Sequence, residues 1–143
     1  MPKPDDVGVG TALLVLNEKK QLLLGKRKGA HCAGTWCCPG GWMDRTDKTS
    51  SEAVIREAAE ECGIEVQFAE PFIWTTEDHE ELGVRTVTLY HTAISGDWTG
   101  TPAILEPEKC DGWEWFDLDT IPDQLFPGLR ETIAALRELE ASL

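Results

Sequence analysis

Three glutamates, Glu57, Glu60 and Glu61, lie within five consecutive residues. On a helix that turns about 100° per residue, Glu61 falls about 40° and Glu60 about 300° from Glu57, so their carboxylates share one face. Like charges at these spacings destabilise a helix by a few tenths of a kcal/mol, and we therefore expect a counter-charge. Hard divalent cations bind oxygen ligands of this kind. The alternative is a solvated acidic face, which is ordinary in an acidic chain.

The segment around these acids has the signals of an amphipathic helix. Thr49 is the predicted N-cap, Glu52 the returning acid of a capping box, and Gly63 the left-handed stop. Arg56 lies within one turn of Glu52 and Glu60, so it can pair with a carboxylate without occupying the metal face. The stripe expected to face the core contains Ile55, Ala58, Ala59 and Cys62.

A glycine turn, Pro39-Gly40-Gly41, precedes this helix by a short loop. Glycine lets a backbone approach a ligand closely, because no side chain is in the way. The turn belongs to a segment from Gly25 to Asp47 that we predict to be a long loop with one short strand near Thr35–Cys38. Loops of this length within a compact domain are usually functional, which favours a binding site over a solvated face.

The region from Gly41 to Ile64 resembles the Nudix box, G-x5-E-x7-R-E-U-x-E-E-x-G-U, in which U is bulky and aliphatic. The stretch from Arg56 to Ile64 fits the second half of that pattern. The first half departs from it: Asp47 stands where the first Glu is expected, eight residues rather than seven precede Arg56, and Thr46 replaces the usual glycine. Three further segments are similar to nucleoside triphosphate diphosphatases of this family: Leu22–Trp36, Glu106–Phe116 and Asp123–Leu129.

The resemblance implies a Nudix-type α/β/α sandwich with a mixed β-sheet. It implies Mg²⁺-dependent hydrolysis of a nucleoside triphosphate, with a modified or oxidised purine among the candidates, to a nucleoside monophosphate and pyrophosphate. Two alternatives stay open. One is hydrolysis of another nucleoside diphosphate compound, such as a nucleotide sugar, ADP-ribose or a dinucleoside polyphosphate. The other is a non-catalytic nucleotide-binding module.

The resemblance also suggests roles for individual residues. The metal, Mg²⁺ or alternatively Mn²⁺, would be held by Gly41, Glu57, Glu60 and Glu61. Glu57 or Glu60 would orient or deprotonate the water, and Arg56 completes the catalytic set. Substrate binding falls to Arg27, Gly40 and Gly41 for the phosphates and to Phe126, Gly128 and Leu129 for the nucleobase. Glu108 or Glu114 could add a carboxylate at the mouth of the site.

The cysteines and histidines suggest no further site. His31, Cys32, Cys37 and Cys38 lack the paired spacing of a structural zinc site, so buried thiols are the better interpretation. His31, His79 and His91 fit no ligand spacing either, and we expect them on the surface or in satisfied packing.

The elements that would position these residues alternate between strands and helices, which predicts one mixed α/β domain over residues 1–143. A second helix is expected over Pro127–Leu139, with its apolar residues at helical spacing. The predicted strands are Val7–Leu16, Gln21–Leu24, Glu65–Trp74, Val84–Ile94 and Gly112–Phe116.

Composition narrows the class of protein. The 26 acidic and 13 basic side chains give a net charge of −13, which argues against a nucleic-acid polymer as partner. A small phosphorylated ligand such as a nucleotide stays open, because a divalent metal can invert the local field. No apolar run approaches the roughly 20 residues of a membrane span, and the start lacks the apolar region of a secretory signal. The odd count of five cysteines favours reduced thiols in a cytoplasm. A homodimer stays open, because similar proteins are often homodimers and the six tryptophans could serve an interface or the core.

Overall fold

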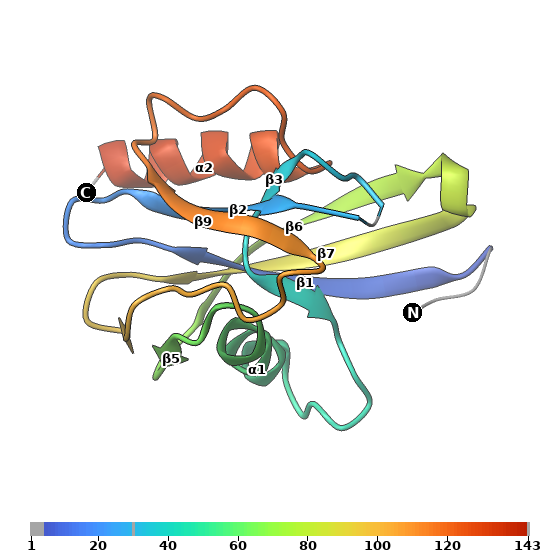
Figure 1. Cartoon of the computed structure of the whole chain (residues 1–143), viewed down its shortest axis with the longest axis horizontal. Helices are drawn as coiled ribbons and strands as arrows, with labels where there is room; N and C mark the ends of the chain where they lie inside the picture. Colours follow the sequence, from blue (N-terminus) through green and yellow to red (C-terminus); the bar gives the residue numbers. More distant parts are fainter. Residues whose placement is uncertain (1–4, 30, 143) are drawn as a thin grey trace.

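The computed structural model describes residues 5–29 and 31–142, which form the mixed α/β architecture expected from the sequence (Figure 1). The helical elements are α1 (Ser50–Cys62), the short 3₁₀ helix η1 (Glu80–Leu82) and α2 (Leu129–Ala141). The long strands are β1 (Val7–Val15), β2 (Leu22–Arg27), β6 (Glu70–His79), β7 (Val84–Ala93) and β9 (Cys110–Phe116). The short strands are β3 (Trp36–Cys37), β4 (Gly40–Trp42), β5 (Glu65–Val66) and β8 (Trp98–Thr99).

The main sheet is mixed, as predicted. Its strands follow the order β4-β1-β7-β6, and β1 pairs in parallel with β7 from Val7 opposite Arg85 to Val15 opposite Ala93. The other pairs in this sheet are antiparallel. In the described part of the chain, β3, β2 and β9 form a second, antiparallel sheet, and β5 pairs with β8.

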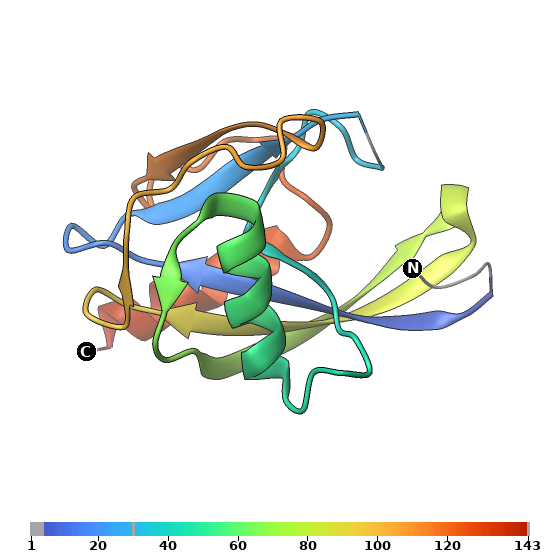
Figure 2. The same cartoon turned by 60° about the horizontal axis from the view of Figure 1, so that its bottom comes forward.

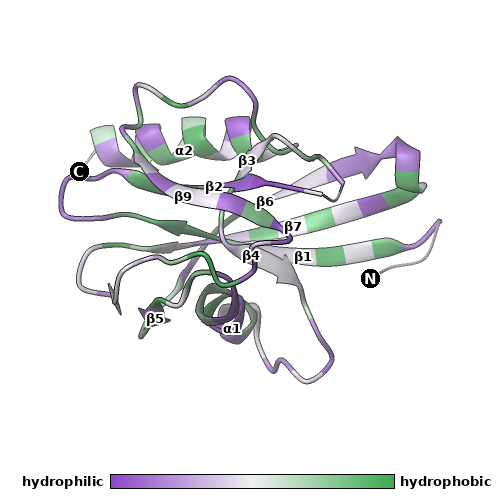
Figure 3. Ribbon diagram, in the orientation of Figure 1, coloured by the Kyte–Doolittle hydropathy of each residue, from purple (hydrophilic) through white to green (hydrophobic). Residues whose placement is uncertain are grey.

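From Thr11 onward, strand β1 is buried on both faces and separates two hydrophobic clusters. Leu14 packs with residues of α2, whereas Leu13 and Val15 pack with residues of α1. Because successive side chains of a strand point to opposite faces, a continuous apolar run serves both layers at once. The two helices therefore lie on opposite sides of the sheets, which confirms the predicted α/β/α sandwich (Figure 2). Figure 3 shows hydrophobic residues recurring along β1 and α2.

Several predicted boundaries were wrong. The predicted loop over Gly25–Asp47 contains the end of β2 and all of β4 as well as β3, because β4 is too short to show a period and is held by backbone pairing with β1. The predicted strand over Glu65–Trp74 is two strands, β5 and β6, and β6 continues through a polar stretch to His79. Helix α2 begins at Leu129 rather than Pro127, because Gly128 is its N-cap.

Among the described residues, no helix is both long enough and apolar enough to span a bilayer.

Candidate functional site

Helix α1 begins and ends where the sequence predicted. The Glu52 N–H donates to the Thr49 hydroxyl at 3.1 Å, and Gly63, at φ 75°, donates its N–H to the carbonyls of Ala58 and Ala59. The capping box is only half formed: the Glu52 carboxylate accepts from the Lys48 N–H at 2.8 Å rather than from the N-cap residue. These caps fix where the helix begins and ends.

The helix faces the core with a slightly different stripe from the one predicted. Ala53, Val54, Ala58 and Cys62 are buried, whereas Ala59 is exposed. The reason is that positions 54, 58 and 62 form one i, i+4 row, which directs position 59 to solvent. Glu57 and Glu61 border this row and are partly buried, whereas the Glu60 side chain is 52% exposed. The three acids therefore lie on one face of the helix, but they differ in their exposure to solvent.

Strand β4 brings the glycine turn directly against these acids. The Gly40 N–H donates to Glu61 Oε1 at 3.2 Å. A Cβ on Gly41 would lie 2.7 Å from the carboxyl carbon of Glu57, and a Cβ on Gly40 would overlap the Thr11 backbone. Position 40 therefore requires glycine, because the β1 backbone leaves no room for a side chain, whereas a side chain at position 41 would displace the Glu57 carboxylate.

The carboxyl of Glu61 is buried beside a second acid, which disfavours its charged form. Burial raises the pKa of the Glu61 carboxyl well above its ordinary value, the charge of Glu57 raises it further, and the Gly40 N–H opposes both effects. A cation beside these carboxylates would reverse that shift. The carboxylates of Glu57 and Glu61 offer oxygen ligands, which suit Mg²⁺ or Mn²⁺. The Gly41 carbonyl, also suggested as a ligand, accepts from the Thr11 hydroxyl at 3.0 Å. The residues present thus fit a hard divalent cation.

Arg56 is held by the residue at which the box pattern departs. Its guanidinium donates to both carboxylate oxygens of Asp47, from Nε at 3.1 Å and from Nη2 at 2.9 Å. Its Nη1 also lies 3.0 Å from Glu57 Oε1 and 3.4 Å from Glu60 Oε1, whereas Glu52 is engaged by Lys48. This pairing lowers the pKa of Asp47 and raises the pKa of Arg56. The Asp47 substitution therefore keeps a carboxylate where it can orient Arg56.

The acids open onto a cavity of about 540 Å³, which we call the acidic cavity. Gly40, Gly41, Arg56, Glu57, Glu60 and Glu61 all line it, together with Arg27, Lys26 and Lys109. Among described residues, the added carboxylate at this cavity is Glu106 rather than Glu108 or Glu114, and its charge contributes to the raised pKa of Glu61. Sequence reasoning missed Glu106 because the loop before β9 has no period that shows which acid turns inward.

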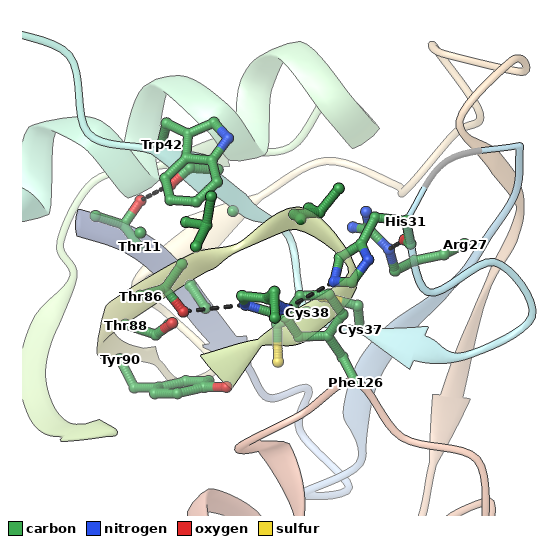
Figure 4. Close-up of a pocket in the computed structure, with 17 residues that line it drawn as sticks. Thr11, Arg27, His31, Cys37, Cys38, Trp42, Thr86, Thr88, Tyr90 and Phe126 are labelled. Atoms are coloured by element: carbon green, nitrogen blue, oxygen red, sulfur yellow. Dashed lines mark hydrogen bonds between the residues drawn. The ribbon is translucent and has the colours of Figure 1, made fainter. Parts of the chain in front are cut away.

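A second cavity of about 350 Å³, the apolar cavity, lies on the other side of β4 (Figure 4). Phe126, Trp42, Tyr90 and Val84 contribute to its walls, and Thr86 and Thr88 contribute hydroxyls. The two cavities have six lining residues in common: Arg27, Cys37, Cys38, Gly40, Gly41 and Trp42. One ligand with a polar end and a flat apolar end could therefore occupy both.

Arg27 lies where the two cavities meet. Its Nε donates to the His31 carbonyl at 2.9 Å, and its guanidinium lies 4.9 Å from the centre of the Phe126 ring. Phe126 thus belongs to the apolar cavity, as the resemblance implied for a nucleobase neighbour.

Two residues suggested for the nucleobase lie elsewhere. Leu129 is 1% exposed and packs in the core beneath α2, because the first turn of that helix faces the sheet. Gly128, at φ 88°, caps the helix so closely to β6 that a Cβ would lie 2.9 Å from Thr75 Oγ1. Among the described residues that line the two cavities, neither appears.

Behind the apolar cavity lies a buried acid that the sequence did not single out. Glu77 on β6 is 6% exposed and accepts from the hydroxyls of Thr86 at 3.2 Å and Thr88 at 2.5 Å. Polar residues in a strand usually indicate a solvated face, and only the cross-strand pairing of β6 with β7 reveals that this one is internal.

Comparisons with known proteins agree on one family. The model of the NUDIX domain family matches residues 6–140. The chain is 28% identical over 131 residues to the RNA pyrophosphohydrolase of Gluconacetobacter diazotrophicus, covering 78% of this chain and 77% of that protein. It is 27% identical over 127 residues to a Bacillus subtilis (strain 168) protein named "Putative 8-oxo-dGTP diphosphatase", covering 87% and 76%.

A solved structure resembles the whole fold. The crystal structure of a MutT NUDIX hydrolase from Burkholderia pseudomallei superimposes with a TM-score of 0.83 at 29% identity, covering 91% of this chain and 98% of that one.

Proposed function

Because the chain belongs to the NUDIX domain family, we propose that it hydrolyses a nucleoside triphosphate to a nucleoside monophosphate and pyrophosphate. One observation carries the proposal: the acidic cavity and the apolar cavity share β4 and Arg27. A nucleotide has the matching division, with a metal-binding phosphate chain at one end and a flat base at the other.

The residues of the acidic cavity would have three roles: to hold the metal, to accept a proton from water and to orient a carboxylate. Gly41, Glu57, Glu60 and Glu61 would hold the divalent metal, which supplies charge neutralisation at the phosphoryl oxygens and lowers the pKa of a bound water. Glu57 or Glu60 would accept the proton as the water oxygen bonds to phosphorus and the bridging P–O bond breaks. Arg56, fixed by Asp47, orients the Glu57 carboxylate on which this step depends.

The residues of the apolar cavity would select the substrate. Arg27 lines both cavities. Its planar guanidinium would bind a phosphate group through bidentate hydrogen bonds. Phe126 and Trp42 would contact the base, and the Thr86 and Thr88 hydroxyls offer hydrogen bonds to its edge. A modified or oxidised purine is the favoured substrate, supported by the name of the Bacillus subtilis relative.

A second candidate comes from the other relative, which is named as an RNA pyrophosphohydrolase. The 5′ end of an RNA also carries a phosphate chain next to a nucleoside. The net charge of −13 disfavours extended contacts with the rest of such a polymer, since those contacts depend on basic side chains. The proposed substrate is therefore a free nucleotide.

Three broader predictions also stay proposals: one domain, a cytoplasmic location and a homodimer. For the last, Trp74 is 66% exposed and could serve an interface, whereas the other five tryptophans are at least partly buried, with Trp42 in the wall of both cavities.

Activity on a panel of substrates tests the function. With Mg²⁺, we expect pyrophosphate from a normal or oxidised purine nucleoside triphosphate, and a loss of at least ~10²-fold in kcat for Glu57→Gln and for Glu61→Gln. Glu138→Gln on the exposed face of α2 is the matched control and should retain wild-type turnover. The panel includes a nucleotide sugar, ADP-ribose, a dinucleoside polyphosphate and a triphosphorylated RNA. Equal turnover by wild type and both site variants would contradict the proposal.

A further inference from the structure

A cluster of nitrogen and sulfur donors lies at the rim of the apolar cavity, apart from the acids. His31 and Cys32 come from the loop after β2, and His79 ends β6. His31 Nε2 lies 2.7 Å from His79 Nδ1 and 3.1 Å from Cys32 Sγ. All three donor atoms lie within 4.8 Å of one another. Sequence spacing alone disfavoured a site here, because His79 lies 48 residues from His31.

Each imidazole has its other nitrogen beside an oxygen. Glu81 Oε1 lies 2.6 Å from His31 Nδ1, and Thr86 Oγ1 lies 3.1 Å from His79 Nε2. The contact of His79 with Thr86 is a hydrogen bond, whereas the buried His31 Nδ1 lies close to Glu81 without hydrogen-bond geometry. A hydrogen bond at the outer nitrogen fixes the ring orientation of a metal-binding histidine, and His79 has this support. His31 Nε2 faces both His79 Nδ1 and the Cys32 thiol.

We propose that His31, Cys32 and His79 bind a borderline-soft transition-metal ion such as Zn²⁺, and that the bound ion inhibits nucleotide binding in the apolar cavity. The second half of this statement rests on the proposed function. The first half rests on the donor cluster alone.

The donor set separates this site from the carboxylates. Thiolate and imidazole favour Zn²⁺ and its neighbours, whereas carboxylate and carbonyl oxygens favour Mg²⁺. A tetrahedral zinc ion needs ligand atoms about 3.3 Å (N to N) and about 3.6 Å (N to S) apart, given its bond lengths. The observed 2.7 Å and 3.1 Å are each within about 1 Å of these values. All three donor atoms lie within 4.8 Å of one another, so binding requires the side chains to move by about an ångström.

Metal binding requires a neutral imidazole and a thiolate. Burial and the neighbouring His31 lower the pKa of His79, which favours the neutral ring, whereas burial raises the pKa of Cys32, so the ion must displace the thiol proton. When the ion binds, the sulfur of Cys32 forms the new bond and its proton passes to solvent, with no change of oxidation state.

Occupancy would affect the cavity directly, because two of the three ligands form part of its wall. His31 and His79 both line the apolar cavity, and their rings lie 6.3 Å and 5.9 Å from the ring of Phe126 (Figure 4 shows His31 and Phe126). An ion between the imidazoles would join the β2–β3 loop to the end of β6 across this rim. The base would then meet a fixed edge that carries the charge of the ion.

The binding half is tested with Co²⁺ as a spectroscopic probe, in excess Mg²⁺ to fill the carboxylate site. We expect wild-type protein to develop a thiolate-to-cobalt charge-transfer absorption that saturates at one ion per chain. Cys32→Ser should abolish the band, His79→Gln should weaken binding at least ~10-fold, and Cys110→Ser should retain it. Absence of the band in wild type, or its persistence in Cys32→Ser, would overturn the proposed site.

The inhibitory half is tested by adding Zn²⁺ to a hydrolysis assay in excess Mg²⁺. Among the described residues lining the two cavities, Cys32 does not appear, so Cys32→Ser should keep wild-type turnover without Zn²⁺. We expect it to need at least ~10-fold more Zn²⁺ for half-inhibition than wild type. Equal inhibition of both proteins would overturn the regulatory effect. If no substrate in the panel is hydrolysed, the proposed function fails, whereas the cobalt result stands independently.

Discussion

At the scale of single side chains, the acidic cavity places Glu61 in an unfavourable environment when no cation is present. Its carboxyl is buried beside Glu57, and its pKa is raised from 4.5. A raised carboxyl pKa means that the folded protein binds a proton more readily than the unfolded chain. The free energy of unfolding of the metal-free protein therefore falls as the pH rises above the ordinary carboxyl pKa of 4.5. At neutral pH, part of that stability has already been lost.

Replacing Glu61 by Gln should therefore raise the thermal stability of the metal-free protein. Each kcal/mol recovered corresponds to a Tm increase of roughly 2–4 °C for a domain of this size. We expect Glu61→Gln in EDTA near neutral pH to melt above wild type, and MgCl₂ to stabilise wild type more than the variant. Glu138→Gln should match wild type in both buffers. A lower Tm for Glu61→Gln in EDTA would show that the buried Glu61 carboxylate does not destabilise the metal-free protein.

Asp47 should affect stability in the opposite sense, because Arg56 holds its pKa below the ordinary 3.8. A lowered carboxyl pKa gives stability that is complete above the ordinary value and is lost as the pH falls through the folded-state value. The Tm difference between wild type and Asp47→Asn should stay constant near neutral pH and close below about pH 4. Asp123→Asn, on an exposed loop, is the control. A difference that widens on acidification would contradict this account.

At the scale of elements, α1 depends on its caps, because its acidic face contributes repulsion rather than stability. Thr49→Ala removes the hydroxyl that accepts from Glu52 and should cost about 1 kcal/mol of unfolding free energy. Urea unfolding measures the loss, with Thr101→Ala at an exposed position as the control. An unchanged midpoint for Thr49→Ala would mean that tertiary packing alone fixes the start of the helix.

The same helix shows what sequence can predict. Its N-cap, its Gly63 stop and the grouping of Glu57 and Glu61 are encoded within a few residues, so local rules were sufficient. Strand β4 was not predictable, because three residues show no period and its position depends on pairing with β1. The same limit applied to Glu106, which reaches the cavity only through the path of a loop.

The errors at the C-terminal end have a similar cause. Helical spacing predicted an apolar row that begins at Leu129, and Leu129, Ile133 and Leu136 do pack in the core. The family resemblance had also suggested Leu129 for the nucleobase, but the burial of its side chain favours the packing role. The His31–His79 contact joins a loop to the end of a strand, and tertiary structure alone reveals such a pair.

At the scale of the whole molecule, β1 links the two layers. Its residues alternate between the cluster under α1 and the cluster under α2, so neither layer keeps its core without the strand. We therefore expect one cooperative unfolding transition, as proposed for a single domain. Far-ultraviolet circular dichroism and tryptophan fluorescence should give coincident midpoints. Two separated transitions would show that the layers unfold independently and would contradict the one-domain proposal.

The parallel pairing of β1 with β7 also affects how the chain folds during its synthesis on the ribosome. The partner of Val15 is Ala93, so β1 leaves the exit tunnel long before its central neighbour has been made. Contacts so distant in sequence form slowly, because the intervening chain must first lose conformational freedom. We therefore expect the apolar run of β1 to stay unpaired during much of synthesis, when exposed apolar strands are prone to aggregate.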